Sequence, residues 1–293
     1  MKKKILILGS DSQLAKCLKD NKTNKYNYLF FNKKELDVTN IKKIKLLVNK
    51  INPYVIINCT AFTEVDNAEN NIKLANSINY IAIKNIIDSI KNKKILFVHF
   101  STDYVFDGLK KISYTEKDKT NPISVYGKTK LKGEQILIKE NKFYLIFRIS
   151  WLYSKYKKNL LTNFYYLSKN NKNLNIVADN IGRPTNANEF SKFLYIAIDK
   201  TLKNNSLSGL YNYSDSGISS SWYDLVNFIY SQMKFKGLEV PILYKIKQES
   251  FKSKAKRPIN SSFNLKKTSN AFNYKIKNWK INLKSEIKNF IKL

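Results

Sequence analysis

"KILILGSDSQLAKCLKD", residues 4–20, joins a short apolar run to a helical pattern through a single glycine, Gly9. The same order, an apolar strand and then a helix, recurs along the first half of the chain. Such alternation predicts a parallel sheet with helices on both faces. The runs are continuously apolar, which is typical of strands buried on both sides. Further strands are predicted in NYLFFN (27–32), YVIINCT (54–60), KILFVHFS (94–101) and YLIFRIS (144–150).

The fold class predicted from this pattern is α/β, a Rossmann-like doubly wound parallel sheet with a smaller C-terminal α/β lobe. Helices are expected at 41–51, as one long helix at 64–92, and from about residue 125. Beyond residue 155 the alternation fades into short strands and separate helices. We therefore divide the chain into a first domain, 1–155, and a second lobe, 156–293, and expect some late segments to pack back on the first.

The formal charge of +31 comes from 53 lysines and arginines against 22 acidic residues. A nucleic-acid binder usually concentrates its basic residues on one face. Here lysine is spread along the chain with asparagine, isoleucine and tyrosine, which share A/T-rich codons. Genome composition is the simpler explanation, so no specific nucleic-acid partner is expected.

Membrane and metal functions are not expected either. No apolar run approaches the ~18 residues of a membrane span, and the initial ILIL is shorter than the core of a signal peptide. A cytoplasmic protein is the prediction. Cys17 and Cys59 are the two cysteines and His99 the one histidine, too few for a disulfide framework or a thiolate metal site. His99 is interpreted as a hydrogen-bonded strand residue.

The segment after the first strand has the position of a phosphate-binding loop. Gly9, Ser12 and Ala15 have the spacing of a dinucleotide-binding glycine pattern with its second and third glycines replaced. A left-handed Ser12 would cost on the order of 1–2 kcal/mol, and an ordinary strand–turn–helix is the alternative. The second strand ends in Asn32 and Lys33 without a carboxylate, which favours NADPH and leaves NADH open.

"VYGKTKLKGE", residues 125–134, places Tyr126 and Lys130 one helical turn apart. Side chains four positions apart on a helix are neighbours. The pair is either a solvated helix face or a phenol adapted to transfer a proton.

Four motifs decide between these interpretations: NCTAFTEVDNAE (58–69), FSTDYVFDG (100–108), NPISVYGKTKLKGE (121–134) and FRISWLYS (147–154). Together they resemble the extended short-chain dehydrogenases/reductases, and among these the dTDP-4-dehydrorhamnose reductase family. VADNIGRPTNANEF (177–190) and AKRPINSSFNL (255–265) extend the resemblance over nearly the full chain. It implies NAD(P)H-dependent reduction of the C4 keto group of dTDP-4-dehydro-6-deoxy-L-mannose to dTDP-L-rhamnose, with a dTDP-sugar as substrate.

The resemblance also implies roles for individual residues. Tyr126 would protonate the carbonyl oxygen, Lys130 would lower the pKa of Tyr126 and bind the nicotinamide ribose, and Thr102 would hydrogen-bond the substrate oxygen or Tyr126. Further cofactor-binding residues would be Gly9, Ser12, Gln13, Leu14, Asp37, Val38, Ala61, Phe62 and Thr63. Further substrate-binding residues would be Asp103, Trp151, Asn163 and Arg257. Structural roles remain open for Trp151, Asp103, Phe62, Gln13 and Asp37.

Two other functions compete with this reductase. A non-catalytic NADP-binding regulatory subunit, resembling that of methionine adenosyltransferase, would suit the altered glycine loop but does not require Thr102, Tyr126 and Lys130. A related sugar-nucleotide epimerase or dehydratase would share the Tyr–Lys pair, although Thr102–Asp103 is not the Asp–Glu pair expected of a dehydratase. A homodimer is possible for any of them.

Overall fold

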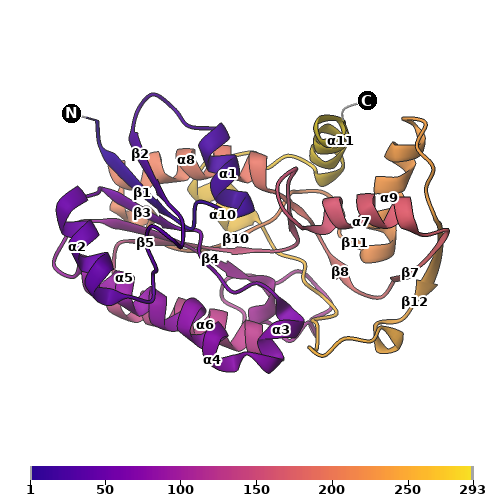
Figure 1. Cartoon of the computed structure of the whole chain (residues 1–293), viewed down its shortest axis with the longest axis horizontal. Helices are drawn as coiled ribbons and strands as arrows, with labels where there is room; N and C mark the ends of the chain where they lie inside the picture. Colours follow the sequence, from indigo (N-terminus) through magenta and orange to yellow (C-terminus); the bar gives the residue numbers. More distant parts are fainter. Residues whose placement is uncertain (1, 292–293) are drawn as a thin grey trace.

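The computed structural model describes residues 2–291, and its centre is a six-stranded parallel sheet in the order β10-β5-β4-β3-β1-β2 (Figure 1). The strands are β1 (Lys4–Leu8), β2 (Asn27–Phe31), β3 (Val55–Asn58), β4 (Leu96–Thr102), β5 (Tyr144–Ile149) and β10 (Gly209–Tyr213). All five pairings are parallel. The predicted fold class is confirmed.

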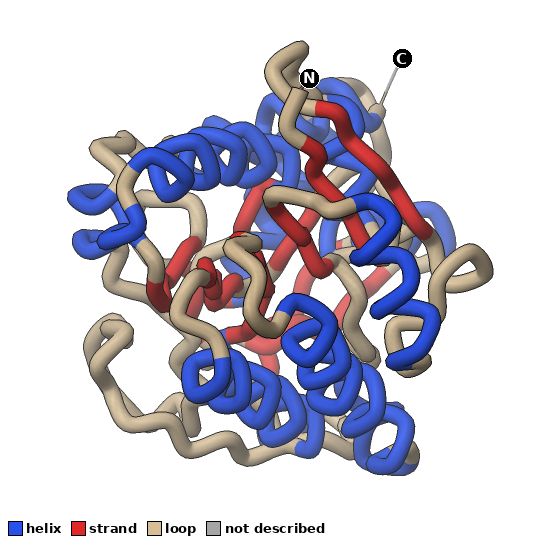
Figure 2. Tube along the Cα trace, turned by 90° about the vertical axis from the view of Figure 1, so that its left-hand side faces the viewer, coloured by secondary structure: helices blue, strands red, loops and turns tan. Residues whose placement is uncertain are grey.

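Helices cover both faces of this sheet (Figure 2). One apolar core joins it to α2 (Ile41–Ile51), α5 (Ala82–Ile90) and α6 (Val125–Glu140). On the other face, α1 (Gln13–Asp20) and α8 (Ala187–Lys203) pack against it. The predicted bounds of α2 are met because Asn40 caps its start and Asn52, in the left-handed conformation before Pro53, ends it.

The single helix predicted at 64–92 is wrong. The segment forms α3 (Val65–Asn70), α4 (Ile72–Asn76), a π-helical turn η1 (Ser77–Ile81) and α5. Asn71 interrupts the helix with φ −123° and ψ 47°, and its side chain donates to the Asn67 carbonyl oxygen at 3.0 Å. Asparagine side chains compete with the helical backbone in this way, and the π-turn presents Asn79 to the loop after β3.

The second lobe has its own apolar core. β7 (Asn173–Val177) and β12 (Ile242–Ile246) pair in parallel. The helices of the lobe are α7 (Leu160–Asn170), α9 (Trp222–Lys234) and α11 (Trp279–Phe290). Two short strand pairs complete it: β6 (Leu152–Tyr153) pairs with β9 (Thr185–Asn186), and β8 (Ile181–Gly182) pairs with β11 (Ser220–Ser221).

Several segments after residue 155 contact elements of the first half of the chain. β10 forms an edge of the central sheet beside β5, and the α8 side chain Tyr195 donates a hydrogen bond to the Leu18 carbonyl of α1 at 2.8 Å. α10 (Lys266–Ala271) adjoins β10. The chain therefore crosses between its halves several times after residue 155.

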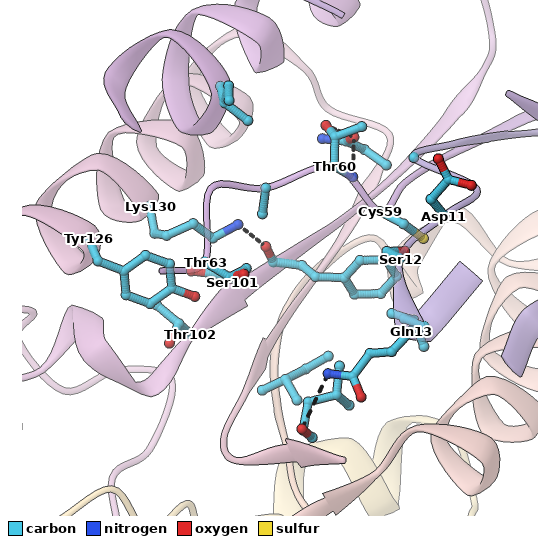
Figure 3. A pocket seen from close by; sticks show the side chains of 18 of the residues that line it. Asp11, Ser12, Gln13, Cys59, Thr60, Thr63, Ser101, Thr102, Tyr126 and Lys130 are labelled. Carbon is cyan, nitrogen blue, oxygen red and sulfur yellow. Dashed lines mark hydrogen bonds between the residues drawn. The ribbon is translucent and has the colours of Figure 1, made fainter. Parts of the chain in front are cut away.

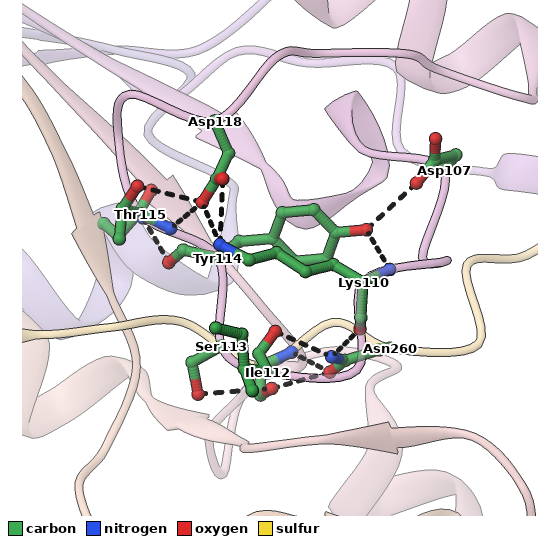
Figure 4. A network of polar contacts seen from close by, with 10 residues as sticks. Asp107, Lys110, Ile112, Ser113, Tyr114, Thr115, Asp118 and Asn260 are labelled. Atoms are coloured by element: carbon green, nitrogen blue, oxygen red, sulfur yellow. Dashed lines mark hydrogen bonds and ion pairs between the residues drawn. The ribbon is translucent and has the colours of Figure 1, made fainter.

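A polar network after η2 (Asp103–Val105) also joins the first half of the chain to the second half (Figure 4). Tyr114 forms a β-bridge with Phe263, and the Asn260 amide donates to the Lys110 carbonyl oxygen at 2.6 Å. Lys110 is paired with Asp118 at 2.7 Å. These contacts fix the loop at 107–121 against the segment at 258–264. Within residues 2–291, no helix is long and apolar enough to cross a membrane.

Candidate active site

A cavity of about 720 Å³ opens at the carboxyl ends of the central strands (Figure 3). Its wall includes residues at the carboxyl ends of four of these strands or within two residues of them: Gly9 after β1, Thr60 after β3, Thr102 in β4 and Trp151 after β5. The second lobe contributes Trp222. Ligands of open parallel sheets bind at this edge because the strand ends and helix starts converge there.

The loop after β1 is a tight turn that leads directly into the capped start of α1. Gly9 has φ +77°, and a Cβ atom there would lie 2.8 Å from Thr60 Cγ2 and 2.9 Å from the Thr60 nitrogen. Ser12 has φ −68° and caps α1 by accepting a hydrogen bond from Ala15 N. The strain considered for Ser12 is therefore absent, and a serine serves here as a helix cap. Glycine is required at the first position of the pattern, and Ser12 takes the second position without backbone strain.

Gly9→Ala should destabilise the protein by about 2–4 kcal/mol, because it adds a steric clash with Thr60 to the strain of a left-handed alanine. Urea unfolding measures the change. Gly237→Ala is the matched control, since Gly237 has φ +75° with nothing within 4 Å of its added Cβ. Equal losses of unfolding free energy in the two variants would show that the close approach of Gly9 to Thr60 does not affect stability.

Lys33, Asp37 and Val38, which follow the edge strand β2, line the end of the cavity beside that strand. Asp37 accepts hydrogen bonds from Thr39 N at 2.9 Å and Thr39 Oγ1 at 2.7 Å. These bonds hold the pKa of Asp37 below its ordinary value. Asp37 therefore stabilises its turn and lines the cavity, while Lys33 supplies positive charge at the same end.

Tyr126 and Lys130 lie on the first turns of α6, which Ser124 caps. Both line the cavity and are buried, with 9% and 3% exposure. Glycines allow the helix to approach its neighbours closely: a Cβ at Gly127 would lie 2.2 Å from the Tyr104 carbonyl oxygen, and one at Gly133 would lie 2.3 Å from that of Asn79. The solvated-face interpretation of the Tyr–Lys pair is thereby excluded.

The orientation of Lys130 differs from the expectation. Its ammonium group donates to the Phe100 carbonyl oxygen at 2.5 Å (Figure 3). Burial raises the pKa of Tyr126 to about 12, and the Thr102 hydroxyl opposes this rise. Lys130, whose ammonium is bound to the Phe100 carbonyl oxygen, has no part in this shift, so the expected lowering of the Tyr126 pKa by Lys130 is not found in this structure.

Two other titratable groups in this wall are also shifted by burial. Burial lowers the pKa of Lys130 to about 8, against the opposing charge of Glu134. Burial raises the pKa of Asp103 to about 6, although its carboxylate accepts from Thr102 Oγ1 at 3.0 Å. Clustered perturbed groups in a cleft are typical of catalytic sites.

An aromatic pair forms the wall between the sheet and the second lobe. Trp151 has φ +46°, and its carbonyl oxygen accepts from Thr185 N at 3.1 Å. Its ring lies 4.7 Å from that of Trp222 at 30°. A Cβ at Gly182 would lie 2.6 Å from Trp151 Cζ2. A left-handed tryptophan is rare, and such strain clusters at functional sites.

Comparisons with known proteins identify the family. The RmlD substrate binding domain family matches residues 2–291. A dTDP-4-dehydrorhamnose reductase from Aggregatibacter actinomycetemcomitans is 34% identical over 289 residues, covering 96% of this chain and 97% of the relative. The chain belongs to the dTDP-4-dehydrorhamnose reductase family. One from Salmonella typhimurium is 32% identical over 85% of this chain and 83% of the relative.

Solved structures of the family have the same fold over the whole chain. A dTDP-4-dehydrorhamnose reductase from Bacillus anthracis, in complex with NADP, has a TM-score of 0.89 at 33% identity, covering 99% of this chain and 100% of that one. One from Clostridium acetobutylicum has a TM-score of 0.90 at 32% identity with the same coverage. A UDP-glucose 4-epimerase from Thermotoga maritima, at 13% identity and a TM-score of 0.78, shares the fold.

Most residues that the family resemblance singled out line this cavity. They are Gly9, Ser12, Gln13, Leu14, Asp37, Val38, Ala61, Thr63, Thr102, Asp103, Tyr126, Lys130 and Trp151.

Three others are not among the lining residues. Phe62 packs behind the wall against the cluster that contains Tyr126, and Asn163 lies on α7. Arg257 is engaged by Asp66 of α3, with Nη2 to Oδ2 at 2.7 Å. In this structure the guanidinium of Arg257 thus has a carboxylate partner where a substrate phosphate was expected.

Several lining residues were missed by sequence reasoning, among them Tyr104, Lys157, Lys158 and Trp222. Tyr104 stands within the motif FSTDYVFDG and could have been found there. The two lysines had no distinguishing signal in a lysine-rich chain. His99 is fully buried, with Nδ1 3.4 Å from the Asn58 amide nitrogen. Within residues 2–291, no group of three or more His, Cys, Asp or Glu side chains could hold a metal ion.

Proposed function

We propose that this protein reduces the C4 keto group of dTDP-4-dehydro-6-deoxy-L-mannose to give dTDP-L-rhamnose, with NADPH as the reductant. The observation that carries the proposal is a single cavity with a phosphate-binding turn at Gly9 on one side and buried Thr102, Tyr126 and Lys130 on the other. Family membership supports the substrate, and the NADP complex of the Bacillus anthracis relative supports the cofactor.

The residues present fit a dinucleotide. Gly9 leaves the space that a Cβ would fill beside Thr60, and the start of α1 offers free backbone N–H groups to a diphosphate. Lys33 would provide charge for a 2′-phosphate, and the residue that directly follows β2 is Asn32 rather than the acidic residue that binds the ribose of NAD. When bound, the reduced nicotinamide supplies the hydride.

Tyr126 would act as the general acid. A phenol with a pKa of about 12 keeps its proton throughout the neutral range, so the acid form is always present for protonating the C4 oxygen. Thr102, whose hydroxyl neighbours that of Tyr126 (Figure 3), would orient the oxygen. Lys130 would exchange the Phe100 carbonyl for the nicotinamide ribose, and its charge would stabilise the phenolate left after proton transfer.

The remaining assignments follow the two halves of the chain. We assign cofactor binding to residues 1–155 and sugar-nucleotide binding mainly to residues 156–293, with Asp103 and Trp151 at their junction. Arg257 would reach a substrate diphosphate by exchanging its pairing with Asp66, and Asn163 would act from α7. A cytoplasmic homodimer is the proposed working form, and light scattering on the purified protein tests its mass.

Product analysis separates this reductase from its competitors. Incubation with the dTDP-ketosugar and NADPH should give dTDP-L-rhamnose and one equivalent of NADP⁺, identified by NMR. An epimerase would return an isomeric ketosugar or sugar nucleotide without net NADPH oxidation. A regulatory subunit would bind NADPH without turnover.

The pKa of Lys130 predicts an alkaline limit. Lys130 is charged below about pH 8 in the free protein and neutral above it, so kcat/KM for NADPH should fall as the pH rises past about 8. Tyr126 adds no loss there because its pKa is about 12. In Lys130→Arg the guanidinium stays charged. The residual activity of this variant should therefore not fall as the pH rises past about 8. A wild-type profile flat to pH 10 would contradict this role.

A further inference from the structure

The second half of the chain contributes two lysines to the cavity, Lys157 and Lys158. They lie in the segment between β6 and α7. Among residues 2–291, neither ammonium group forms an ion pair with an acidic side chain. Two adjacent, uncompensated cations in a cavity wall favour an anionic ligand.

The segment that carries these lysines has a fixed conformation. The Asn159 amide donates to the carbonyl oxygens of Ser154 at 2.7 Å, Tyr156 at 3.0 Å and Lys157 at 3.1 Å. Thr162 Oγ1 donates to the Lys157 carbonyl oxygen at 3.0 Å. Lys157 itself is left-handed, with φ +57°. A bulky residue keeps such a strained conformation only where neighbouring contacts hold the backbone in place. The hydrogen bonds of Asn159 and Thr162 hold it here.

The same segment lies along α1. Ser154 Oγ donates to Gln13 Oε1 at 3.1 Å, and the Gln13 amide donates to the Leu152 carbonyl oxygen at 3.3 Å. Tyr156 donates to Asp20 Oδ2 at 2.7 Å. Gln13 is the first residue of α1 and lines the cavity. The segment therefore contacts α1 at both of its ends, at Gln13 and at Asp20. The two lysines share the cavity wall with Gln13 and Ser12, at the end of α1 where free N–H groups and the helix dipole stabilise an anion.

We propose that Lys157 and Lys158 bind the diphosphate of the dinucleotide, so that the second lobe completes the cofactor site that begins at α1. This inference rests on the proposed function and adds to it a binding element from outside the first domain. The diphosphate of the dTDP-sugar has the same chemistry, and binding measurements distinguish the two sources.

The test compares wild type with the double variant Lys157→Gln/Lys158→Gln, using NADPH, NADH and dTDP as separate probes in fluorescence or calorimetric titrations. The Kd for NADPH should rise about tenfold or more, since two charge-assisted contacts are lost. The Kd for NADH should rise by a similar factor, because both dinucleotides contain the diphosphate. The Kd for dTDP should change little. Lys169→Gln/Lys172→Gln is the matched control, as it removes the same charge from exposed positions of the same lobe outside the cavity wall.

Each other outcome overturns the inference in a recognisable way. Unchanged dinucleotide binding, or a loss equalled by the control pair, would remove the lysines from the site while leaving the proposed function intact. Weaker binding of NADPH without weaker binding of NADH would assign the lysines to the 2′-phosphate. Weaker binding of dTDP alone would assign them to the substrate. Failure of the wild type to bind either dinucleotide would defeat the proposed function as well.

Discussion

Tyr126→Phe should lower kcat by about 10²–10⁴-fold while the Kd for NADPH stays near its wild-type value, because a positioned general acid contributes about that factor. Tyr126 is buried in the wall beside Thr102, and its hydroxyl is the group that the proposed proton transfer uses. The phenylalanine ring preserves the packing around Phe62 and Tyr104. Steady-state kinetics with the dTDP-ketosugar and a separate NADPH titration measure the two effects.

Tyr104→Phe is the matched control for that experiment. The Tyr104 ring lies 5.4 Å from the Tyr126 ring in an edge-on arrangement, and Tyr104 lines the same cavity. Removing its hydroxyl changes the same wall without touching the proposed acid, so kcat should fall by much less. Comparable losses in both variants, or an active Tyr126→Phe enzyme, would remove Tyr126 from the chemistry.

Glu134→Ala should destabilise the fold by about 3–5 kcal/mol, because it leaves a buried arginine without its carboxylate. Arg148 of β5 bonds Glu134 of α6 through Nε to Oε1 at 2.7 Å and Nη2 to Oε2 at 2.9 Å. Their side chains are 4% and 1% exposed. The pair anchors α6 to the sheet one turn after Lys130, so its loss should also disturb the active-site wall.

Urea unfolding of Glu134→Ala measures that cost. Glu249→Ala is the control, since Glu249 pairs with Lys247 on the surface, where the two side chains are 76% and 75% exposed. Solvent screens such a pair, so its removal should leave the unfolding midpoint almost unchanged. If both variants unfold at the wild-type midpoint, the buried pair does not anchor α6.

Five strands of the sheet were predictable because they are apolar on both faces, and α2 carries its own start and stop residues. The sixth strand, β10, was expected in the second lobe, because its partner β5 lies far away in the sequence. The broken helix at 64–92 was not predicted. Asn71, whose side chain bonds the Asn67 carbonyl oxygen four residues back, offers a local signal for the interruption, whereas the π-turn depends on an asparagine side chain whose partners lie elsewhere. Asn79, for example, donates to the Phe62 carbonyl oxygen at 3.1 Å and to Thr129 Oγ1 at 3.1 Å. Local propensity contains no information about such distant partners.

The composition of the site followed from motifs, but its electrostatics did not. The four-residue spacing correctly put Tyr126 and Lys130 on one helix face. It could not predict that Lys130 would turn to the Phe100 carbonyl or that burial would raise the pKa of Tyr126, since both depend on tertiary packing. Similarly, Arg257 was predicted from its fork-shaped chemistry, whereas its pairing with Asp66 joins residues 191 positions apart.

The most direct test of the central claim is NADPH oxidation by the purified protein with dTDP-4-dehydro-6-deoxy-L-mannose. The account predicts that NADPH absorbance falls only when the ketosugar is present, that dTDP-L-rhamnose accumulates in equal amount, and that Tyr126→Phe nearly abolishes both. Tight NADPH binding with no oxidation in the presence of this ketosugar would contradict it.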